Sequence, residues 1–321
     1  DELYAAIFVR PAMALGRFET FALMAYEFFF GGRIRPPVSH AVIEVGVGGR
    51  LDPANAISHS ISVVTSIGMD HEAILGSTLG EIAKEKFAIV QPENKLVHGR
   101  LPPEAGVALS EAQRVSGARG VSAPTLSYAV ERVNGEPLWT IETRWGKAAL
   151  SLFGTRAVEN TSIALEVLDQ IGEPVAELLP VLSQVRWPCR MEPFQFRGKK
   201  VYLSGDHNLD GARSLVELLK EFEFEKMKLV VGVGANKPVT AMLEIFKEIP
   251  RAHITLTTTP FRGAMPAELE KSQSLVHAIE PDPVRALQTA VDQAGANDIV
   301  VVTGSLYLVG YLRSWLMKAM T

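Results

Sequence analysis

Short apolar segments alternate with helical segments in the second half of the chain, and this alternation constrains the fold more than any other feature. Strands without a polar face are typical of a parallel sheet that helices cover on both sides. The strand segments lie in KKVYLSGD, MKLVVGVG, HITLTTT and NDIVVVTGS, and helices are predicted over 210–223, 239–248, near 265–274 and over 305–319. Ligands of such sheets bind beyond the carboxyl ends of the strands. We therefore expect polar function at Ser204–Asn208, Gly232–Lys237, Thr258–Arg262 and Thr303–Ser305.

The first half of the chain predicts a further α/β arrangement. Residues 1–30 have apolar residues at helical spacing and predict two helices that separate near Pro11 or Gly16. Strands are predicted over 41–47, 60–68 and 95–99, helices over 78–90 and 159–172, and a hairpin turn at Asn134-Gly135. The proline-containing segment SQVRWPCRMEPF predicts a crossing between domains, which gives domains of residues 1–186 and 187–321.

Composition excludes several classes of protein. A chain with 47% hydrophobic and 21% charged residues is ordinary for a soluble α/β protein. A net charge of −4 gives no general attraction to nucleic acid or to an anionic membrane. No apolar run approaches the roughly 18 residues of a membrane span. The single cysteine, Cys189, fits a reducing cytoplasm. Because the chain begins at Asp1 and enters directly into helical sequence, we expect that further sequence precedes it.

Two groups of polar residues follow predicted strands in the first half. Glu44 interrupts the apolar start of AVIEVGVGGRLDPAN, and a buried carboxylate needs a partner. Asp70 and His71 follow the strand of residues 60–68. Glu44 and His71 could bind Mg²⁺ together with phosphate oxygens, or they could form a buried pair in which each residue satisfies the other.

Lys84 and Lys86 lie on one predicted helix and face different ways, and a solvated surface charge is the ordinary interpretation of each.

The second half offers a polar turn in place of a phosphate loop. Asp206, His207 and Asn208 join a strand to a helix, where the helix N-terminus suits an anion and where an Asp or Asn cap would suit equally. VGVGANKPV also joins a strand to a helix, but the pattern G-x-x-x-x-G-K-[ST] occurs nowhere in the sequence.

Together these segments resemble the folylpolyglutamate synthase/dihydrofolate synthase family of the Mur ligase superfamily. EVGVGGRLDPAN is similar to its E-V-G-L-G-G-R-L-D-A-T-N, SIGMDHEAILGSTLGEIAKEKFAI to its S-I-G-x-D-H…L-G-x-T…I-A-x-E-K-A-G-I, WPCRME to its W-P-G-R-x-E, and TGSLYLVG to its G-S-x-Y-x-V-G. The similarity covers essentially the whole chain, in order. It implies an α/β fold with a central, mostly parallel-sheet ATPase domain over residues 1–186 and a smaller Rossmann-like domain over 187–321.

The resemblance also implies an activity and the residues that carry it. Glu44, His71 and a carbamylated Lys86 would be Mg²⁺ ligands, with His71 and Lys86 in the catalytic centre. Asn160, Arg190, His207 and Asn208 would face ATP. The reaction would add L-glutamate to a folate or dihydropteroate carboxylate through an acyl phosphate. The family resemblance further implies a monomer with small-molecule partners, and no nucleic acid or membrane partner.

The chain departs from the family pattern mainly in the segments that would face the nucleotide. The family's phosphate loop, G-T-N-G-K-G-S, would precede Asp1 and is missing here. The departures are Ser204-Gly205-Asp206-His207-Asn208-Leu209 for D-G-A-H-N-P, Asn236-Lys237-Pro238 for D-K-D, Arg156-Ala157 for H-Q, and Cys189 for the glycine of P-G-R. A non-catalytic relative that acts as a binding or scaffold protein is therefore the alternative. A Mur-type ligase of cell-wall precursors is a third hypothesis, although the signature around Glu44 belongs to the folate branch.

Overall fold

The computed structural model describes residues 15–33, 35–117, 120–234, 239–261, 263 and 269–320. Contacts between Cα atoms divide the chain into two compact units, a first unit of Asp1–Thr125 with Glu159–Pro174 and a second unit of Leu126–Val158 with Val175–Thr321. The predicted domain boundary after residue 186 stays a prediction. Of the two helices predicted within residues 1–30, the first lies outside the described residues, and the second is α2 (Arg17–Phe30).

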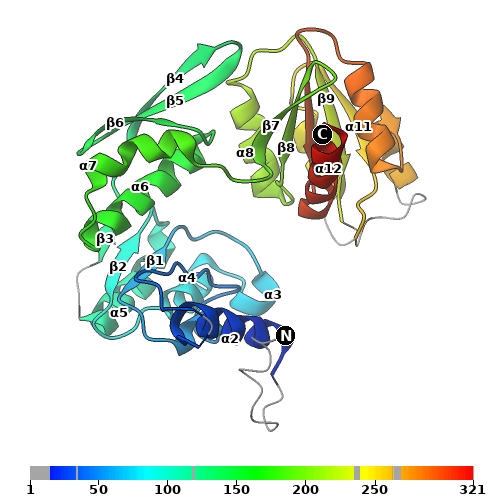
Figure 1. The fold of residues 1–321 in the computed structure, drawn as a ribbon. Helices are drawn as coiled ribbons and strands as arrows, with labels where there is room; N and C mark the ends of the chain where they lie inside the picture. Colours follow the sequence, from blue (N-terminus) through cyan, green and yellow to red (C-terminus); the bar gives the residue numbers. More distant parts are fainter. Residues whose placement is uncertain are drawn as a thin grey trace. The chain divides into compact units, whose positions relative to one another are not determined.

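The first unit is built on a short parallel sheet in the order β1-β2-β3 (Figure 1). Its strands and helices are β1 (Ile61–Val64), β2 (Lys95–His98), β3 (Val121–Ser122), α3 (Glu72–Leu75), α4 (Leu79–Phe87) and α5 (Gly106–Ser116), with 3₁₀ turns η1 (Pro53–Ala56) and η2 (Pro103–Ala105). It also contains α6 (Thr155–Gln170) from residue 159 onward, while the first four residues of that helix belong to the second unit. Ile82, Phe87 and Leu96 are almost fully buried and form the centre of its core. The strands predicted at 60–68 and 95–99 are confirmed as β1 and β2, and the helix predicted within 78–90 is confirmed as α4.

The strand predicted over residues 41–47 is wrong. Residues 41–45 have no regular structure, and Val42 is 99% exposed. A strand needs a partner for its backbone N–H and C=O groups, and no segment of the described residues pairs with this one. Glu44 is therefore exposed rather than buried, which removes the cost of burial from which its need for a partner was inferred.

The second unit begins with an antiparallel sheet of β4 (Ser127–Val133), β5 (Glu136–Thr143) and β6 (Gly146–Leu150). The predicted hairpin turn is confirmed: Asn134 and Gly135 both have positive φ, at 55° and 77°, as a two-residue type I′ turn requires. The short helix α7 (Val175–Leu178) and the 3₁₀ segment η3 (Leu179–Gln184) follow.

A six-stranded sheet in the order β11-β10-β9-β12-β8-β7 forms the rest of the second unit (Figure 1). The elements are β7 (Arg190–Phe196), β8 (Lys199–Ser204), α8 (Leu209–Leu219), β9 (Met227–Gly232), α9 (Val239–Phe246), β10 (Ala252–Thr257), η4 (Glu270–Leu275), β11 (Ala278–Ile279), α11 (Pro283–Asp292), β12 (Ile299–Thr303) and α12 (Leu306–Ala319). All neighbouring pairs are parallel except β7 with β8. The parallel sheet is confirmed, but residues 190–194, predicted as part of a domain crossing, belong to its antiparallel edge strand β7.

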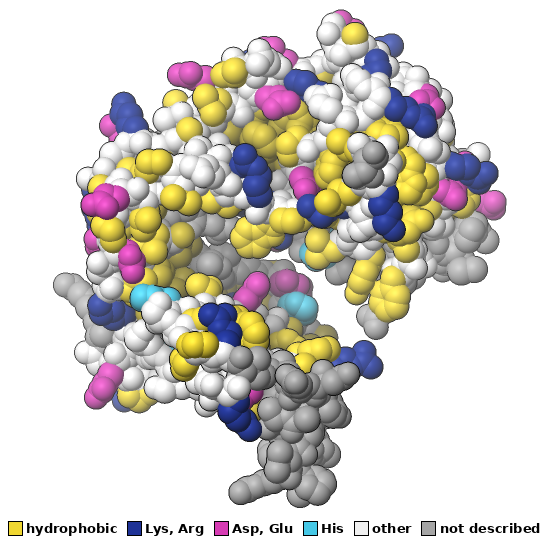
Figure 2. Space-filling model, viewed as in Figure 1, with side chains coloured by type: hydrophobic (Ala, Val, Ile, Leu, Met, Phe, Trp, Pro, Cys, Tyr) yellow, Lys and Arg dark blue, Asp and Glu magenta, His cyan; other side chains and the backbone are white. Residues whose placement is uncertain are grey.

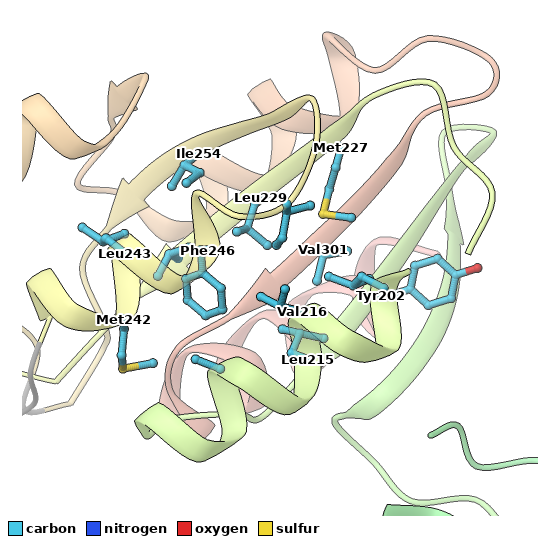
Figure 3. Close-up of a cluster of buried hydrophobic side chains, with 14 of the residues drawn as sticks. Tyr202, Leu215, Val216, Met227, Leu229, Met242, Leu243, Phe246, Ile254 and Val301 are labelled. Carbon is cyan, nitrogen blue, oxygen red and sulfur yellow. The ribbon is translucent and has the colours of Figure 1, made fainter. Parts of the chain in front are cut away.

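Alternate residues of each strand enter different cores. Tyr202, Leu229 and Val301 pack with α8 and α9 in one core (Figure 3). Their sequence neighbours Val230 and Val302 pack with α11 and α12 in the other. Because side chains alternate across a strand, a sheet covered on both faces requires apolar residues at consecutive positions, which explains the runs LVVGV and IVVVT.

The charged side chains are interspersed on the surface. On the face that Figure 2 shows, Lys and Arg side chains lie among Asp and Glu side chains over the described residues. None of the helices in the described ranges combines the length and apolar character that a membrane span needs.

We predict that the second unit loses stability in mild acid through His253, whose ring stacks on that of His277. The rings of His253 and His277 lie 4.8 Å apart, and the Nδ1 atom of His277 accepts a hydrogen bond from the Ile254 amide at 3.0 Å. Burial, followed by the charges of Lys228 and His277, lowers the pKa of His253. The unfolded chain therefore binds a proton more readily, so this stability is present above about pH 6.5 and is lost as the pH falls.

The measurement is the melting temperature of wild type and His253→Gln at about pH 7.5 and about pH 5.5. The variant should lose less stability between the two values. His40→Gln, a change at an exposed histidine, is the control and should behave as wild type. Equal losses in wild type and His253→Gln would contradict the prediction.

Candidate functional site

Asp52 organises the glycine-containing loop that follows Glu44. Its carboxylate accepts hydrogen bonds from the amides of Gly46 at 2.9 Å, Val47 at 3.2 Å and Ala54 at 2.9 Å. Asp52 is only 8% exposed, so these bonds replace its contacts with water. Burial, followed by the charge of Asp52, raises the pKa of the Tyr26 hydroxyl. Sequence reasoning did not single out Asp52, although an Asp before a proline is a helix-cap signal.

The same loop lies directly against the end of α4. A Cβ atom on Gly49 would come within 2.8 Å of the carbonyl oxygens of both Glu85 and Lys86, so only glycine fits there. The Arg50 amide donates to the Glu85 carbonyl at 3.2 Å, and the Arg50 guanidinium pairs with the Glu85 carboxylate at 3.0 Å. Asn55 adds a bond from its side-chain amide to the Ala88 carbonyl at 2.9 Å. The backbone that carries Lys86 is thereby tied to the loop that follows Glu44.

Lys86 and Lys84 lie on α4 in different surroundings. The helix begins with a capping box, in which the Thr78 hydroxyl and the Glu81 carboxylate satisfy the first backbone amides. Hydrogen bonds from the Thr78 hydroxyl and from the Ser77 amide lower the pKa of Glu81. Lys86 is half-buried and Lys84 is exposed, so the predicted difference between the two lysines is confirmed.

His71 lies at the start of α3, which packs against α4. It is exposed and has a left-handed backbone conformation, with φ of 52°. The Asp70 carboxylate accepts a bond from the His71 amide at 2.9 Å and lies 3.8 Å from its ring. The structure thus brings together the elements that carry Glu44, His71 and Lys86. It pairs His71 with Asp70 rather than with Glu44, and the described residues contain no group of three His, Cys, Asp or Glu side chains able to hold a metal ion.

In the second unit, the carboxyl ends of β8, β9 and β12 meet at one edge of the sheet. The Gly304 amide donates to the Asp206 carbonyl at 2.9 Å. Gly304 has a φ of 101°, and a Cβ atom there would lie 2.7 Å from the Gly232 carbonyl oxygen. Of the strand ends at which polar function is predicted, Ser204–Asn208, Gly232 and Thr303–Ser305 meet here, whereas residues 235–238 and Arg262 lie outside the described residues.

The turn between β8 and α8 places His207 and Asn208 at that edge. The Nδ1 atom of His207 lies 3.0 Å from the Gly205 carbonyl and must donate to it, so a neutral ring keeps its Nε2 lone pair free to accept. The Asn208 side chain accepts from the Gly211 amide at 2.7 Å, which confirms the interpretation of Asn208 as a helix cap. Both side chains are half-buried.

Arg190 begins β7, directly opposite Ser204, and is exposed. The turn before it is held by Glu192, whose carboxylate accepts from the Cys189 amide at 2.9 Å and from the Arg313 guanidinium at 2.8 Å. Burial, together with the charge of Glu192, raises the pKa of the Cys189 thiol. Sequence reasoning missed this pair: Glu192 closes the quoted motif WPCRME, but no local signal points to Arg313.

The remaining candidates lie on α6 or outside the described residues. Asn160 is exposed in the second turn of α6, in the first unit, and the departures Arg156 and Ala157 lie in the first turn of the same helix. The departures Asn236, Lys237 and Pro238 belong to the segment that the structure does not describe.

We predict that Asp52→Ala destabilises the first unit. Removal of the carboxylate takes the acceptor from three backbone amides, of which that of Ala54 is buried, so the change should cost about 1–3 kcal/mol of unfolding free energy. Hydrogen exchange of residues 46–54 should become faster, and denaturant unfolding should shift to lower concentration. Glu104→Ala, at an exposed carboxylate, should change neither by more than about 0.5 kcal/mol. Unaltered exchange in Asp52→Ala would show that the loop does not depend on this side chain.

Comparisons with known proteins agree with the sequence motifs. A family model described as Mur ligase, glutamate ligase domain matches residues 189–306. The chain is 30% identical to the dihydrofolate synthase/folylpolyglutamate synthase of Bacillus subtilis, over 86% of this chain and 67% of that protein. It is also 30% identical to a probable bifunctional folylpolyglutamate synthase/dihydropteroate synthase of Haloferax volcanii, over 94% of this chain but only 37% of that protein.

Solved structures give the same fold. The folylpolyglutamate synthase of Thermotoga maritima matches with a TM-score of 0.78 and 27% identity, over 99% of this chain and 74% of that one. The folylpolyglutamate synthase of Mycobacterium tuberculosis complexed with ADP and AMPPCP matches with a TM-score of 0.82 and 23% identity, over 98% of this chain and 78% of that one. The predicted α/β fold class is confirmed.

Proposed function

The chain belongs to the folylpolyglutamate synthase/dihydrofolate synthase family of the Mur ligase superfamily, and on this premise we propose that the protein is an ATP-dependent ligase. Its reaction adds L-glutamate to the carboxylate of a folate or dihydropteroate substrate. The observation that carries the proposal is the close approach of Gly49 to the carbonyl of Lys86, because it ties the family signature EVGVGGRLDPAN to the helix of a candidate catalytic lysine.

The chemistry proceeds in two displacements. A carboxylate oxygen of the substrate attacks the γ-phosphorus of ATP, and ADP leaves with the electron pair of the broken P–O bond. The glutamate amine then attacks the acyl carbon of the resulting acyl phosphate, loses a proton and expels inorganic phosphate. Both steps depend on holding the reactants in line. We assign the contacts with ATP to Asn160, Arg190, His207 and Asn208, and the catalytic centre to His71 and Lys86.

The donor groups of the first unit suit Mg²⁺ only in part. Mg²⁺ takes one or two protein carboxylates and completes its shell with water and phosphate oxygens, so Glu44 and His71 suffice alongside a nucleotide. A lysine ammonium does not suit a cation, whereas a carbamylated Lys86 would offer carboxylate oxygens. Bound Mg²⁺ would neutralise charge on the phosphates. The half-buried position of Lys86 is compatible with such a modification.

A non-catalytic binding or scaffold protein on the same fold is the second candidate. It is favoured by Ser204 and Arg156, which stand where the family pattern has an Asp and a His-Gln pair. The two candidates differ in one property, the Mg²⁺-dependent binding of ATP by the complete polypeptide. In either case we expect a cytoplasmic monomer with small-molecule partners.

We predict that Lys86→Ala abolishes glutamate-dependent ADP release and leaves folding intact, because alanine is a good helix former at a position that is only half-buried. Lys84→Ala, two residues away on the same helix, is the matched control and should keep its activity. Carbamylation is tested by incubation with ¹³C-bicarbonate: a carbamate carbon signal should appear in wild type and in Lys84→Ala, and not in Lys86→Ala. Normal ligation by Lys86→Ala would overturn the catalytic assignment.

We predict that the complete polypeptide sustains ADP release from ATP only when glutamate and a folate substrate are both present, because each turnover consumes both reactants. The measurement is ADP release with all components and with glutamate or the folate substrate left out in turn. No Mg²⁺-dependent ATP binding and no ADP release under any of these conditions would favour the scaffold candidate.

A further inference from the structure

The turn between β8 and α8 carries its acid two residues later than the family pattern does. D-G-A-H-N-P reads Ser204-Gly205-Asp206-His207-Asn208-Leu209, so the leading Asp is absent and an Asp stands in place of Ala. Ser204 is only 2% exposed, and its hydroxyl donates to the Asp206 Oδ2 atom at 2.6 Å. The two departures from the pattern are therefore in direct contact with each other.

The Asp206 carboxylate reaches the place that an acid at residue 204 would occupy. The Oγ atom of a serine and the Cγ atom of an aspartate have the same covalent position, and the carboxylate oxygens extend only about 1.2 Å further. With Asp206 Oδ2 2.6 Å from that position, an acid at residue 204 would meet the Asp206 carboxylate almost atom to atom. Two ionised carboxylates so close repel each other strongly, so this turn accommodates one of the two acids.

The backbone fixes the direction of the Asp206 side chain. The Gly205 amide donates to the Cys189 carbonyl at 2.7 Å, and the Asp206 carbonyl accepts from the Gly304 amide at 2.9 Å. The Asp206 Oδ1 atom lies beside Gly211 in the first turn of α8, where a Cβ atom would come within 2.8 Å of it. The positive end of the α8 dipole also favours a negative charge at this place.

We propose that Asp206 replaces the acid that the family pattern carries at residue 204. The Asp206 carboxylate accepts a hydrogen bond from the Ser204 hydroxyl and so lies close to the place of that acid. Asp206 is thereby a positioning residue, which holds the turn that presents His207 and Asn208 to the nucleotide. This inference rests on the proposed function for its nucleotide readout. The two departures from the family pattern together move one acid from residue 204 to residue 206 and do not remove it. Ser204 therefore no longer favours the scaffold candidate.

The experiment exchanges the two side chains in the complete polypeptide. We compare wild type with Ser204→Asp, Asp206→Ala and the double variant Ser204→Asp/Asp206→Ala, and we measure ATP dissociation constants, KM for ATP, kcat and melting temperature. Asp206→Ala should weaken ATP binding by about tenfold or more and change KM more than kcat. Ser204→Asp should lower the melting temperature because two acids then meet. The double variant should recover both properties, to within about threefold of wild-type affinity.

The matched control is Asp210→Ala, which removes another acid from the first turn of α8. Asp210 is exposed and pairs with Arg213 at the surface, at 3.3 Å, so this variant should bind ATP as wild type does. A double variant no better than the two single changes combined would overturn the exchange, as would a Ser204→Asp variant with a wild-type melting temperature.

The outcomes also separate this inference from the proposed function. Failure of the wild-type polypeptide to bind ATP overturns the proposed function and the positioning role together. The melting temperatures of the four proteins still decide whether one acid replaces the other. ATP binding by wild type without recovery in the double variant overturns the exchange alone and leaves the ligase assignment intact.

Discussion

Burial of both faces of the parallel strands in the second unit restricts where this chain can expose polar groups. Val230 and Val301, which point to opposite faces of the sheet, are both fully buried. Polar side chains can then appear only where strands end, since an unpaired polar group inside either core would be costly. Ser204, Asp206 and Ser305 stand at such ends, and so do the candidate nucleotide residues His207 and Asn208, whereas Asn160 lies on α6.

The two candidate regions obtain their order in different ways. In the first unit, the buried carboxylate of Asp52 accepts hydrogen bonds from three backbone amides in and next to a loop that belongs to no strand. In the second unit, backbone bonds between Gly205 and Cys189 and between Gly304 and Asp206 tie the turn to the neighbouring strand ends. The hydrogen bond between the Ser204 hydroxyl and the Asp206 carboxylate adds a side-chain contact inside the turn, at the two residues where the family pattern has changed.

Sequence reasoning succeeded where the signal was local. Runs such as IVVVT, and the Asn134-Gly135 turn, contain within a few residues all that their conformation requires. It failed over residues 41–45, because a strand depends on a partner elsewhere and the described residues supply none. It overlooked α11 despite an Asp282 cap followed by Pro283, which is a readable start signal. The Glu192–Arg313 pair joins positions 121 residues apart, and no pattern in one sequence could have revealed it.

The contact between Gly304 and Gly232 limits how this edge of the sheet can vary over evolutionary time. A side chain at residue 304 would collide with the backbone of β9 and would also have to adopt a left-handed conformation. New binding specificity at this edge therefore has to come from substitutions in the flanking turns, while the junction of β9 and β12 remains without side chains. Within the described residues, the β8–α8 turn is the segment next to that junction in which the family pattern has already changed.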